Sequence, residues 1–185
     1  LELGRAQSSK MFEALALIRR ARLHAQCMRW SQASGDLDRV RPLLEGSPDR
    51  RRLAIYAWVR VRCQVALGQP LERSLIERLK GISENGADPL PLLHLAGIEA
   101  EIALQDGDRH AAEQAAQRQA RIAADAGFLE MLTDALLLQA RICTDAGRVR
   151  GLREEAFTLA TAQGFADLAA RAARQLAEPV NMQGR

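Results

Sequence analysis

Residues Leu92 to Phe128, LLHLAGIEAEIALQDGDRHAAEQAAQRQARIAADAGF, carry the pattern of a helical hairpin. Apolar residues recur every three or four positions at its start, and no proline interrupts the run up to Asp106. Gly107 can take the left-handed conformation that ends a helix, and Asp108 can cap the next helix. Small residues, mostly alanine, give the second segment a flat face, and Gly127 closes it. The stretch therefore predicts two antiparallel helices joined by a tight turn.

Similar features return at a spacing of about 40 residues. Gly35, Gly68 and Gly147 stand in the same turn role as Gly107. The glycines that close the hairpins are Gly46, Gly86, Gly127 and Gly164. A lone hairpin cannot bury its apolar face without neighbours, so such a period is typical of a stacked array. We expect an all-α fold, a right-handed solenoid of about four antiparallel helical hairpins with a C-terminal capping helix.

The same pattern predicts where the elements begin and end. The first hairpin is expected as a helix over Met11 to Ser34, a turn at Gly35-Asp36 and a short helix over Leu37 to Leu44. Residues predicted on the packed side of the first helix are Leu15, Ile18, Ala21, Ala25 and Met28. The second hairpin is expected over Arg50 to Leu67 and Leu71 to Ile82, and the capping helix over Phe165 to Ala177. Residues 1–10 are expected as a lead-in, 11–178 as the repeat domain and 179–185 as a disordered tail.

Two runs, IEAEIALQDGDRHAAEQA and LLLQARICTDAGRVRGLREEA, resemble degenerate tetratricopeptide repeats. Ala100 and Ala140 stand seven residues before the turn glycine, and Ala112 stands five after it, where that family has small side chains. The looser pattern is similar to the helical sensor regions of large bacterial transcriptional activators of the MalT and LuxR-like ATPase type. The resemblance implies a region that receives an inducer or an inhibitory protein and passes the signal to ATPase and DNA-binding parts elsewhere.

Composition agrees with a helical domain. Hydrophobic residues make up 48% of the 185 residues but aromatic residues only 4%, so the apolar content is mostly Leu and Ala, which favour helices. No apolar run reaches the length of a membrane span, and no secretory leader precedes the first predicted helix. Three cysteines without CxxC spacing, Cys27, Cys63 and Cys143, are expected as reduced core residues, and the cytoplasm as the compartment. Because the chain opens on Leu1, we expect a piece of a longer protein.

A catalytic or metal-binding pattern is missing from the sequence. It contains no glycine-rich nucleotide loop and no H-E-x-x-H motif. His24, His94 and His110 are far apart and none has a partner at metal-ligand spacing. We therefore expect a protein without enzymatic activity and without a cofactor or a metal.

Charge divides the chain into a basic and an acidic half. Residues 1–80 hold 16 basic and 8 acidic side chains, while residues 81–185 hold 10 and 15. The first half is therefore net +8 and the second net −5. Nucleic-acid binding would need clustered cations with aromatic stacking platforms, but Trp30, Tyr56 and Trp58 stand in register with the core. We expect no direct nucleic-acid contact from this segment.

When the hairpins are aligned on their turn glycines, one strip of each first helix mixes polar and apolar residues beside a buried seam. In tetratricopeptide-like arrays the first helices line the concave groove, so this strip predicts the partner-binding residues. They are Arg22, Gln26, Arg29, Val59, Arg62, His94, Ile98, Glu101, Asp134, Leu138 and Arg141. An ordinary solvated face is the alternative interpretation of these charges.

The function expected from the sequence is a sensing or protein-interaction module of a bacterial transcriptional regulator. Its partner would be a protein or peptide, or a small effector, with no membrane contact. The charge split also allows self-association of the basic and acidic halves. The first alternative is a free-standing tetratricopeptide adaptor or chaperone that holds a peptide. A helical enzyme domain is the second, and no site chemistry favours it.

Overall fold

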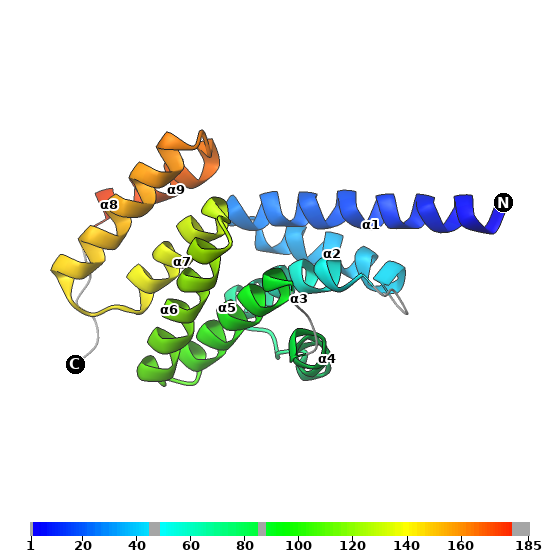
Figure 1. Ribbon diagram of the computed structural model, residues 1–185, viewed down its shortest axis with the longest axis horizontal. Coiled ribbons are helices and arrows are strands. Elements are labelled where there is room, and N and C mark those ends of the chain that lie inside the picture. The colour runs from blue at the N-terminus through cyan, green and yellow to red at the C-terminus, as the bar shows by residue number, and fades with distance from the viewer. Residues whose placement is uncertain (1, 45–48, 85–87, 179–185) are drawn as a thin grey trace. The chain divides into compact units, whose positions relative to one another are not determined.

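A computed structural model describes the backbone of residues 2–44, 49–84 and 88–178, and the side chains of these residues except 2–9 and 84. These residues form nine α-helices and no strand (Figure 1), which confirms the all-α expectation for this part of the chain. The helices are α1 (Glu2–Gln26), α2 (Trp30–Leu44), α3 (Arg50–Ala66), α4 (Arg73–Glu84), α5 (Pro89–Gln105), α6 (Arg109–Asp125), α7 (Leu129–Ile142), α8 (Ala146–Ala162) and α9 (Ala166–Ala177). None of the described helices is both long and apolar enough to cross a membrane.

Five helices end in the same hydrogen-bonded turn, in which one residue takes a positive φ. At Gly107 (φ 81°), the glycine N–H donates to the Leu104 carbonyl at 3.3 Å, and the Asp108 N–H donates to the Ala103 carbonyl at 2.9 Å. This pair of bonds satisfies the last carbonyls of the helix. Among the described residues, those with positive φ are Met28, Gly68, Gly107, Gly127 and Gly164. The four glycine turns are confirmed, and the turn at Met28 was not predicted.

The predicted boundaries of the first two helices are wrong. The first turn lies at residues 27–29, and Gly35 and Asp36 lie inside α2. Asp36 is buried there, and the Arg20 guanidinium of α1 donates to its carboxylate at 2.7 Å from Nε. This charged partner compensates for burial of the carboxylate. A Gly-Asp pair that is typical of a turn is thereby held inside a helix.

The predicted turn at Gly147 is also wrong. That glycine lies in the first turn of α8, and the connection from α7 is the extended segment 143–145. The Asp145 side chain accepts a hydrogen bond of 2.7 Å from the Arg148 N–H and so caps α8. The predicted cap at Asp108 is confirmed, because its side chain accepts from the Ala111 N–H at 3.0 Å.

Helix α1 begins at Glu2, so the backbone of residues 2–10, expected as a lead-in, is helical. A helix, α9, is confirmed at the position predicted for the capping helix, and its Leu168 and Ala172 are buried. The predicted hairpin ends at Gly46 and Gly86, and the predicted tail at 179–185, lie outside the described residues.

The chain divides into two compact units, residues 1–95 and residues 96–185, and the boundary falls inside α5. In unit 1, α1 contacts α2 and α3, and α3 contacts α4. Large side chains that are almost fully buried in unit 1 are Ile18, Leu37, Val40, Val61, Leu79 and Leu93. Each of the first four helices therefore contributes to this core.

Unit 2 is built around α7, which contacts α6, α8 and α9. Large apolar side chains that are almost fully buried among its described residues are Ile98, Leu137, Val149 and Leu168. A cluster of Leu136, Leu137, Ala156 and Ala172 joins α7, α8 and α9. Helix α9 thus completes a core to which three helices contribute.

Candidate protein-binding surface

Helix α1 has two faces of different character. The buried face, on the side of α2 and α3, is made of small and aliphatic residues: Ala14, Leu17, Ile18, Ala21 and Ala25. On the opposite side, exposed positions recur every three or four residues, which places them on one line along the helix. We call this exposed line the α1 stripe: Phe12, Ala16, Arg19, Leu23 and Cys27.

Two large apolar side chains dominate the α1 stripe. Phe12 is 71% exposed and Leu23 is 52% exposed. They are eleven residues apart, which corresponds to about 16 Å along a helix. Met28, 63% exposed, follows them at the turn. Fully burying one side chain of this size stabilises a complex by about 1.5–3 kcal/mol, so a partner that covers both Phe12 and Leu23 has two strong anchor points.

The side chain of Arg20 borders the stripe but is engaged by α2. Its Nη2 lies 2.5 Å from the Asp36 carboxylate, and His24 Nε2 lies 3.9 Å from the same group. The hydrogen bonds from Arg20 lower the pKa of Asp36 below its ordinary value, against the opposing effect of burial. The pair therefore stays charged at neutral pH and ties α1 to α2.

Positive charge remains on the stripe after the ion pairs are counted. Glu13, the acidic residue beside Phe12, lies 3.7 Å from Arg39 of α2. Arg19 within the stripe and Arg29 beyond its end are exposed, and within the described part of the chain neither forms an ion pair. The surface therefore combines apolar anchors with uncompensated cations.

An arginine stacked on two indoles lies elsewhere in unit 1. The Arg62 guanidinium carbon is 5.9 Å from the centre of the Trp30 ring and 5.2 Å from that of Trp58. Both distances are within the range of cation–π attraction. His94 packs behind them, with its ring centre 6.2 Å from that of Trp58, and is only 3% exposed. The stack joins α2, α3 and the first part of α5.

The structure places the other predicted residues of unit 1 at different depths. Gln26 and Val59 are buried, whereas Arg29 is exposed in the turn after α1 and Arg22 is partly exposed on α1. Among the predicted residues of this unit, the arginines therefore reach the surface and the uncharged residues belong to the core.

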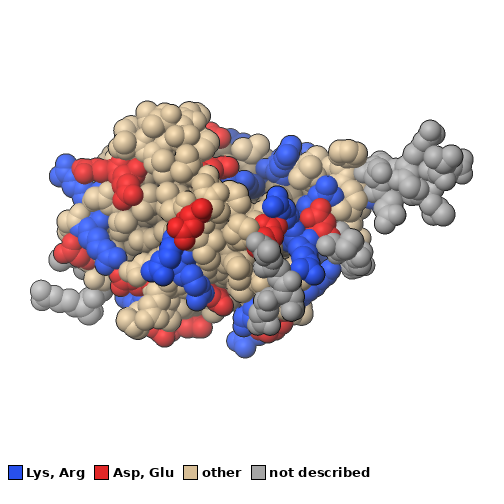
Figure 2. Space-filling model, viewed as in Figure 1, with Lys and Arg blue, Asp and Glu red and all other residues tan. Residues whose placement is uncertain are grey.

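The predicted residues of unit 2 mostly form internal contacts. Ile98 and Leu138 are buried in the core. Glu101, 3% exposed, accepts a bond from Arg141, which joins α5 to α7. Asp134 is buried on α7 and bonds to Arg171 of α9 at 2.6 Å. Acidic and basic side chains also lie side by side in several places on the face shown in Figure 2.

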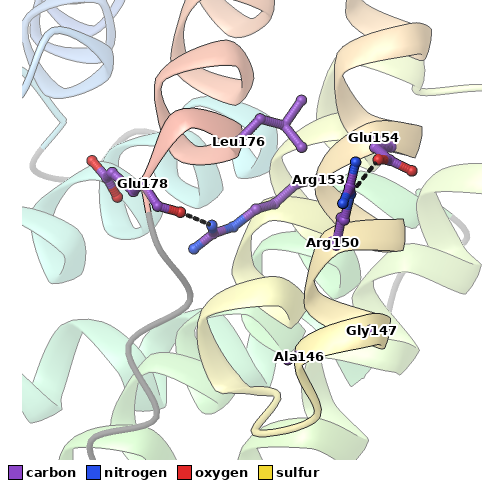
Figure 3. A pocket seen from close by; sticks show the side chains of 7 residues that line it. All are labelled: Ala146, Gly147, Arg150, Arg153, Glu154, Leu176 and Glu178. Atoms are coloured by element: carbon purple, nitrogen blue, oxygen red, sulfur yellow. Dashed lines mark hydrogen bonds and ion pairs between the residues drawn. The ribbon is translucent and has the colours of Figure 1, made fainter.

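A hollow of about 680 Å³ opens between α8 and α9 in unit 2 (Figure 3). It is lined by Ala146, Gly147, Arg150, Arg153, Glu154, Leu176 and Glu178. Arg150 bonds to Glu154 at 2.8 Å, and Arg153 donates to the backbone carbonyls of Gln175 and Glu178. Arg150 is thus paired within α8, whereas Arg153 joins α8 to the end of α9.

The cysteines do not share one environment. Cys63 is buried, and burial raises its pKa to about 11, as expected of a reduced core thiol. Cys27 is exposed at the end of the α1 stripe, so the expectation of a core position is wrong for this residue. Cys143 is partly exposed in the connection between α7 and α8.

Sequence reasoning missed the apolar part of the α1 stripe. Met28 was predicted on the packed side of the first helix. It is exposed because α1 ends at Gln26 and Met28 lies in the turn that follows. Phe12 and Leu23 were not assigned to any face. A signal was present, since they lie eleven residues apart and on the side of the helix opposite to Ile18 and Ala21.

Among the residues that the structure describes, no group of three or more His, Cys, Asp or Glu could hold a metal ion. Comparison of the chain with protein-family models, curated proteins and solved structures found no match.

Proposed function

We propose that this chain is a non-enzymatic protein-binding module, built as a right-handed array of helical hairpins. The observation that carries the proposal is the α1 stripe, with Phe12 71% and Leu23 52% exposed on one helix face. Single exposed apolar residues are ordinary, but large ones aligned beside cations form the kind of patch that proteins cover with a partner. In this proposal α1 is the helix to which the partner binds.

Three of the residues predicted from the sequence are at least partly exposed on unit 1 outside the α1 stripe: Arg22, Arg29 and Arg62. Their side chains reach the surface, and Arg62 is held in place by Trp30 and Trp58. Arginine held by aromatic rings loses little side-chain freedom when it binds a carboxylate, which favours a protein partner with acidic groups. The buried predicted residues position these helices instead of contacting the partner.

The setting of the module is proposed from the repeat runs at residues 98–115 and 136–156. Their resemblance to the sensor regions of MalT-like activators favours the cytoplasmic sensing part of a bacterial transcriptional regulator. In such a protein the partner is an inhibitory protein or an inducer. A free-standing tetratricopeptide adaptor remains the alternative, and the full-length reading frame distinguishes the two through flanking ATPase and DNA-binding parts.

Site-specific photocrosslinking in cells tests the protein-binding function. A benzophenone amino acid replaces Ala16 in the middle of the stripe, and in a matched control it replaces Ser74, an exposed helical residue of unit 1. We expect a discrete crosslinked protein from position 16 only, and its loss when Phe12→Ser and Leu23→Ser are added. Equal crosslinking from both positions, or products that persist in the double variant, would contradict the proposal.

A further inference from the structure

We propose that the α1 stripe binds an amphipathic helix of another protein, and that this helix carries an acidic residue opposite Arg19. The inference rests on the proposed function, because it names the class of partner for the same surface. It follows from the order of side chains along α1, in which an exposed cation lies between two exposed apolar anchors.

The spacing of the anchors fits a helix. Phe12 and Leu23 are about 16 Å apart along the axis of α1, or about three helical turns. A partner helix that lies alongside α1 covers both only if it presents apolar residues at the same spacing. The buried face of α1 is occupied by α2 and α3, so the partner adds a helix on the free side of an existing helical layer.

Arg19 determines the charge of the partner. It lies seven residues after Phe12 and four before Leu23, so a helix covering both anchors also covers Arg19. Removing a guanidinium from water without a partner is costly, and a carboxylate is the group that compensates for it best. Arg29, just beyond the end of the stripe, adds a second positive charge that favours an acidic partner.

A second copy of this chain is a poor occupant of the stripe. In a parallel pairing of two α1 helices, Arg19 of each copy lies at the same level. In the antiparallel pairing that opposes Phe12 to Leu23, the two Arg19 side chains lie about one turn apart. Both arrangements place like charges in an apolar interface, which disfavours self-association through this face.

A membrane surface is also a poor occupant. Helices that lie in the lipid interface keep their cations on the polar face and their apolar residues on the other. On α1 the cation Arg19 lies in line with Phe12 and Leu23, so insertion of these anchors would carry it toward the acyl chains. Such burial of a charge opposes insertion.

The geometry predicts a sequence pattern in the partner. If the partner helix runs antiparallel to α1, an apolar residue opposes Leu23, an acidic residue four positions later opposes Arg19, and an apolar residue eleven positions after the first opposes Phe12. In the parallel direction the acidic residue follows the first apolar residue by seven positions.

Synthetic helical peptides with the antiparallel pattern test the inference on the whole chain. Three peptides differ only at the position opposite Arg19, which is Glu, Gln or Lys, and binding is measured by fluorescence anisotropy at about 50 mM salt, where screening is weak. We expect the Glu peptide to bind about fivefold to tenfold more tightly than the Gln peptide. Arg19→Glu should reverse this order and favour the Lys peptide.

The matched control is Arg73→Glu, a charge reversal at an exposed arginine on α4 of the same unit. It should leave the order of the three peptides unchanged. Phe12→Ser and Leu23→Ser should each weaken binding of the Glu peptide roughly tenfold or more, because each removes an apolar anchor. Circular dichroism melting verifies that each variant is folded, and the charge exchange at Arg19 provides a test that leaves both apolar anchors in place.

The outcomes separate the two proposals. Equal affinity for the three peptides, together with loss of binding in Phe12→Ser, would overturn the acidic partner and leave the protein-binding surface standing. A dimer in sedimentation that Leu23→Ser abolishes, or binding to phosphatidylserine vesicles that exceeds binding to the Glu peptide, would assign the stripe to another occupant and overturn the inference. If no change in the stripe alters the affinity for any peptide, the inference is wrong. The crosslinking experiment then tests the proposed function independently.

Discussion

At the scale of single residues, Met28 adopts a backbone conformation that other turns of this chain give to glycine. Its φ is 57°, and it is the only described residue other than glycine with a positive φ. The left-handed region costs an L-residue roughly 1–2 kcal/mol, and a side chain that is 63% exposed recovers little of this through burial. We predict that Met28→Gly raises the free energy of unfolding by about 0.5–1 kcal/mol, measured by urea denaturation.

The control for Met28→Gly is the same change at a residue with an ordinary φ. Ala126 precedes the turn at Gly127 with φ −88°. There glycine only adds freedom to the unfolded chain, so Ala126→Gly should lower the stability by about 0.5–1 kcal/mol. A decrease at both positions would show that Met28 is not strained.

Two glycines that seemed equivalent in the sequence should respond in opposite ways to substitution. Gly107 has φ 81°, where a β-branched residue is strained, so Gly107→Val should lower the stability by about 1–3 kcal/mol. Gly147 lies inside α8, and an added Cβ would meet only Asp145 Oδ1 at an ordinary 3.5 Å. Gly147→Ala should therefore raise stability by about 0.5 kcal/mol in the same assay. If Gly147→Ala lowered the stability as much as Gly107→Val, the placement of Gly147 inside α8 would be contradicted.

At the scale of elements, the Arg20–Asp36 pair joins α1 to α2 and makes their packing dependent on pH. The hydrogen bond from Arg20 lowers the pKa of Asp36 in the folded state. A lowered folded pKa gives stability that is present above the unfolded value of about 3.9 and is lost as pH falls through the folded pKa. We predict that Asp36→Asn destabilises the protein most near neutral pH and that the difference from the wild type shrinks below about pH 4.

The measurement for Asp36 is urea unfolding between pH 2 and pH 7, a range chosen to include the ordinary carboxyl pKa. Arg20→Ala provides the control, since the two single changes and the double change form a cycle that isolates the pair. A coupling energy that stays constant over this pH range would show that the ionised carboxylate is not what Arg20 stabilises.

The helix ends that could be predicted from the sequence are those with glycine at the left-handed position. Gly107 takes the left-handed conformation that glycine tolerates and Asp108 caps the next helix, so the turn between α5 and α6 was predicted correctly. The first hairpin was not, because its left-handed residue is Met28 while Gly35-Asp36 is held in a helix by Arg20. The pair of Arg20 and Asp36 joins residues 16 positions apart, which the local pattern of the sequence does not reveal.

The candidate surface was predictable only in its charge. The basic character of the first half follows from composition alone. Gly35 and Gly147 lie inside helices, so an alignment on them shifts the predicted positions of the first and fourth hairpins relative to the second and third. The shift carried buried residues such as Asp134 into the predicted strip. Phe12 was left out although it lies on the side of the helix opposite to Ile18 and Ala21, which were predicted to be packed.

At the scale of the whole molecule, the chain contains two compact units, each with a core of its own. Arg19 of the α1 stripe and Arg29 beyond its end, which form no ion pair within the described residues, belong to unit 1. In unit 2 the buried acids Glu101 and Asp134 are bonded to arginines. This difference favours unit 1 as the place of the proposed partner binding, and it predicts that unit 2 responds mainly to changes in its packing.

Removal of α9 tests that packing. Deleting residues 165–185 takes away Leu168 and Ala172 and uncovers Leu136, Leu137 and Ala156, which are at most 5% exposed in the intact chain. Exposed core surface of this kind promotes association, because terminal helices of helical arrays cover the last apolar layer. We expect the shortened chain to melt at a lower temperature and to form oligomers in sedimentation. A chain that lacks only residues 179–185 is the control and should match the intact protein. A deletion of residues 165–185 that leaves the protein monomeric with an unchanged melting temperature would show that α9 does not cap unit 2.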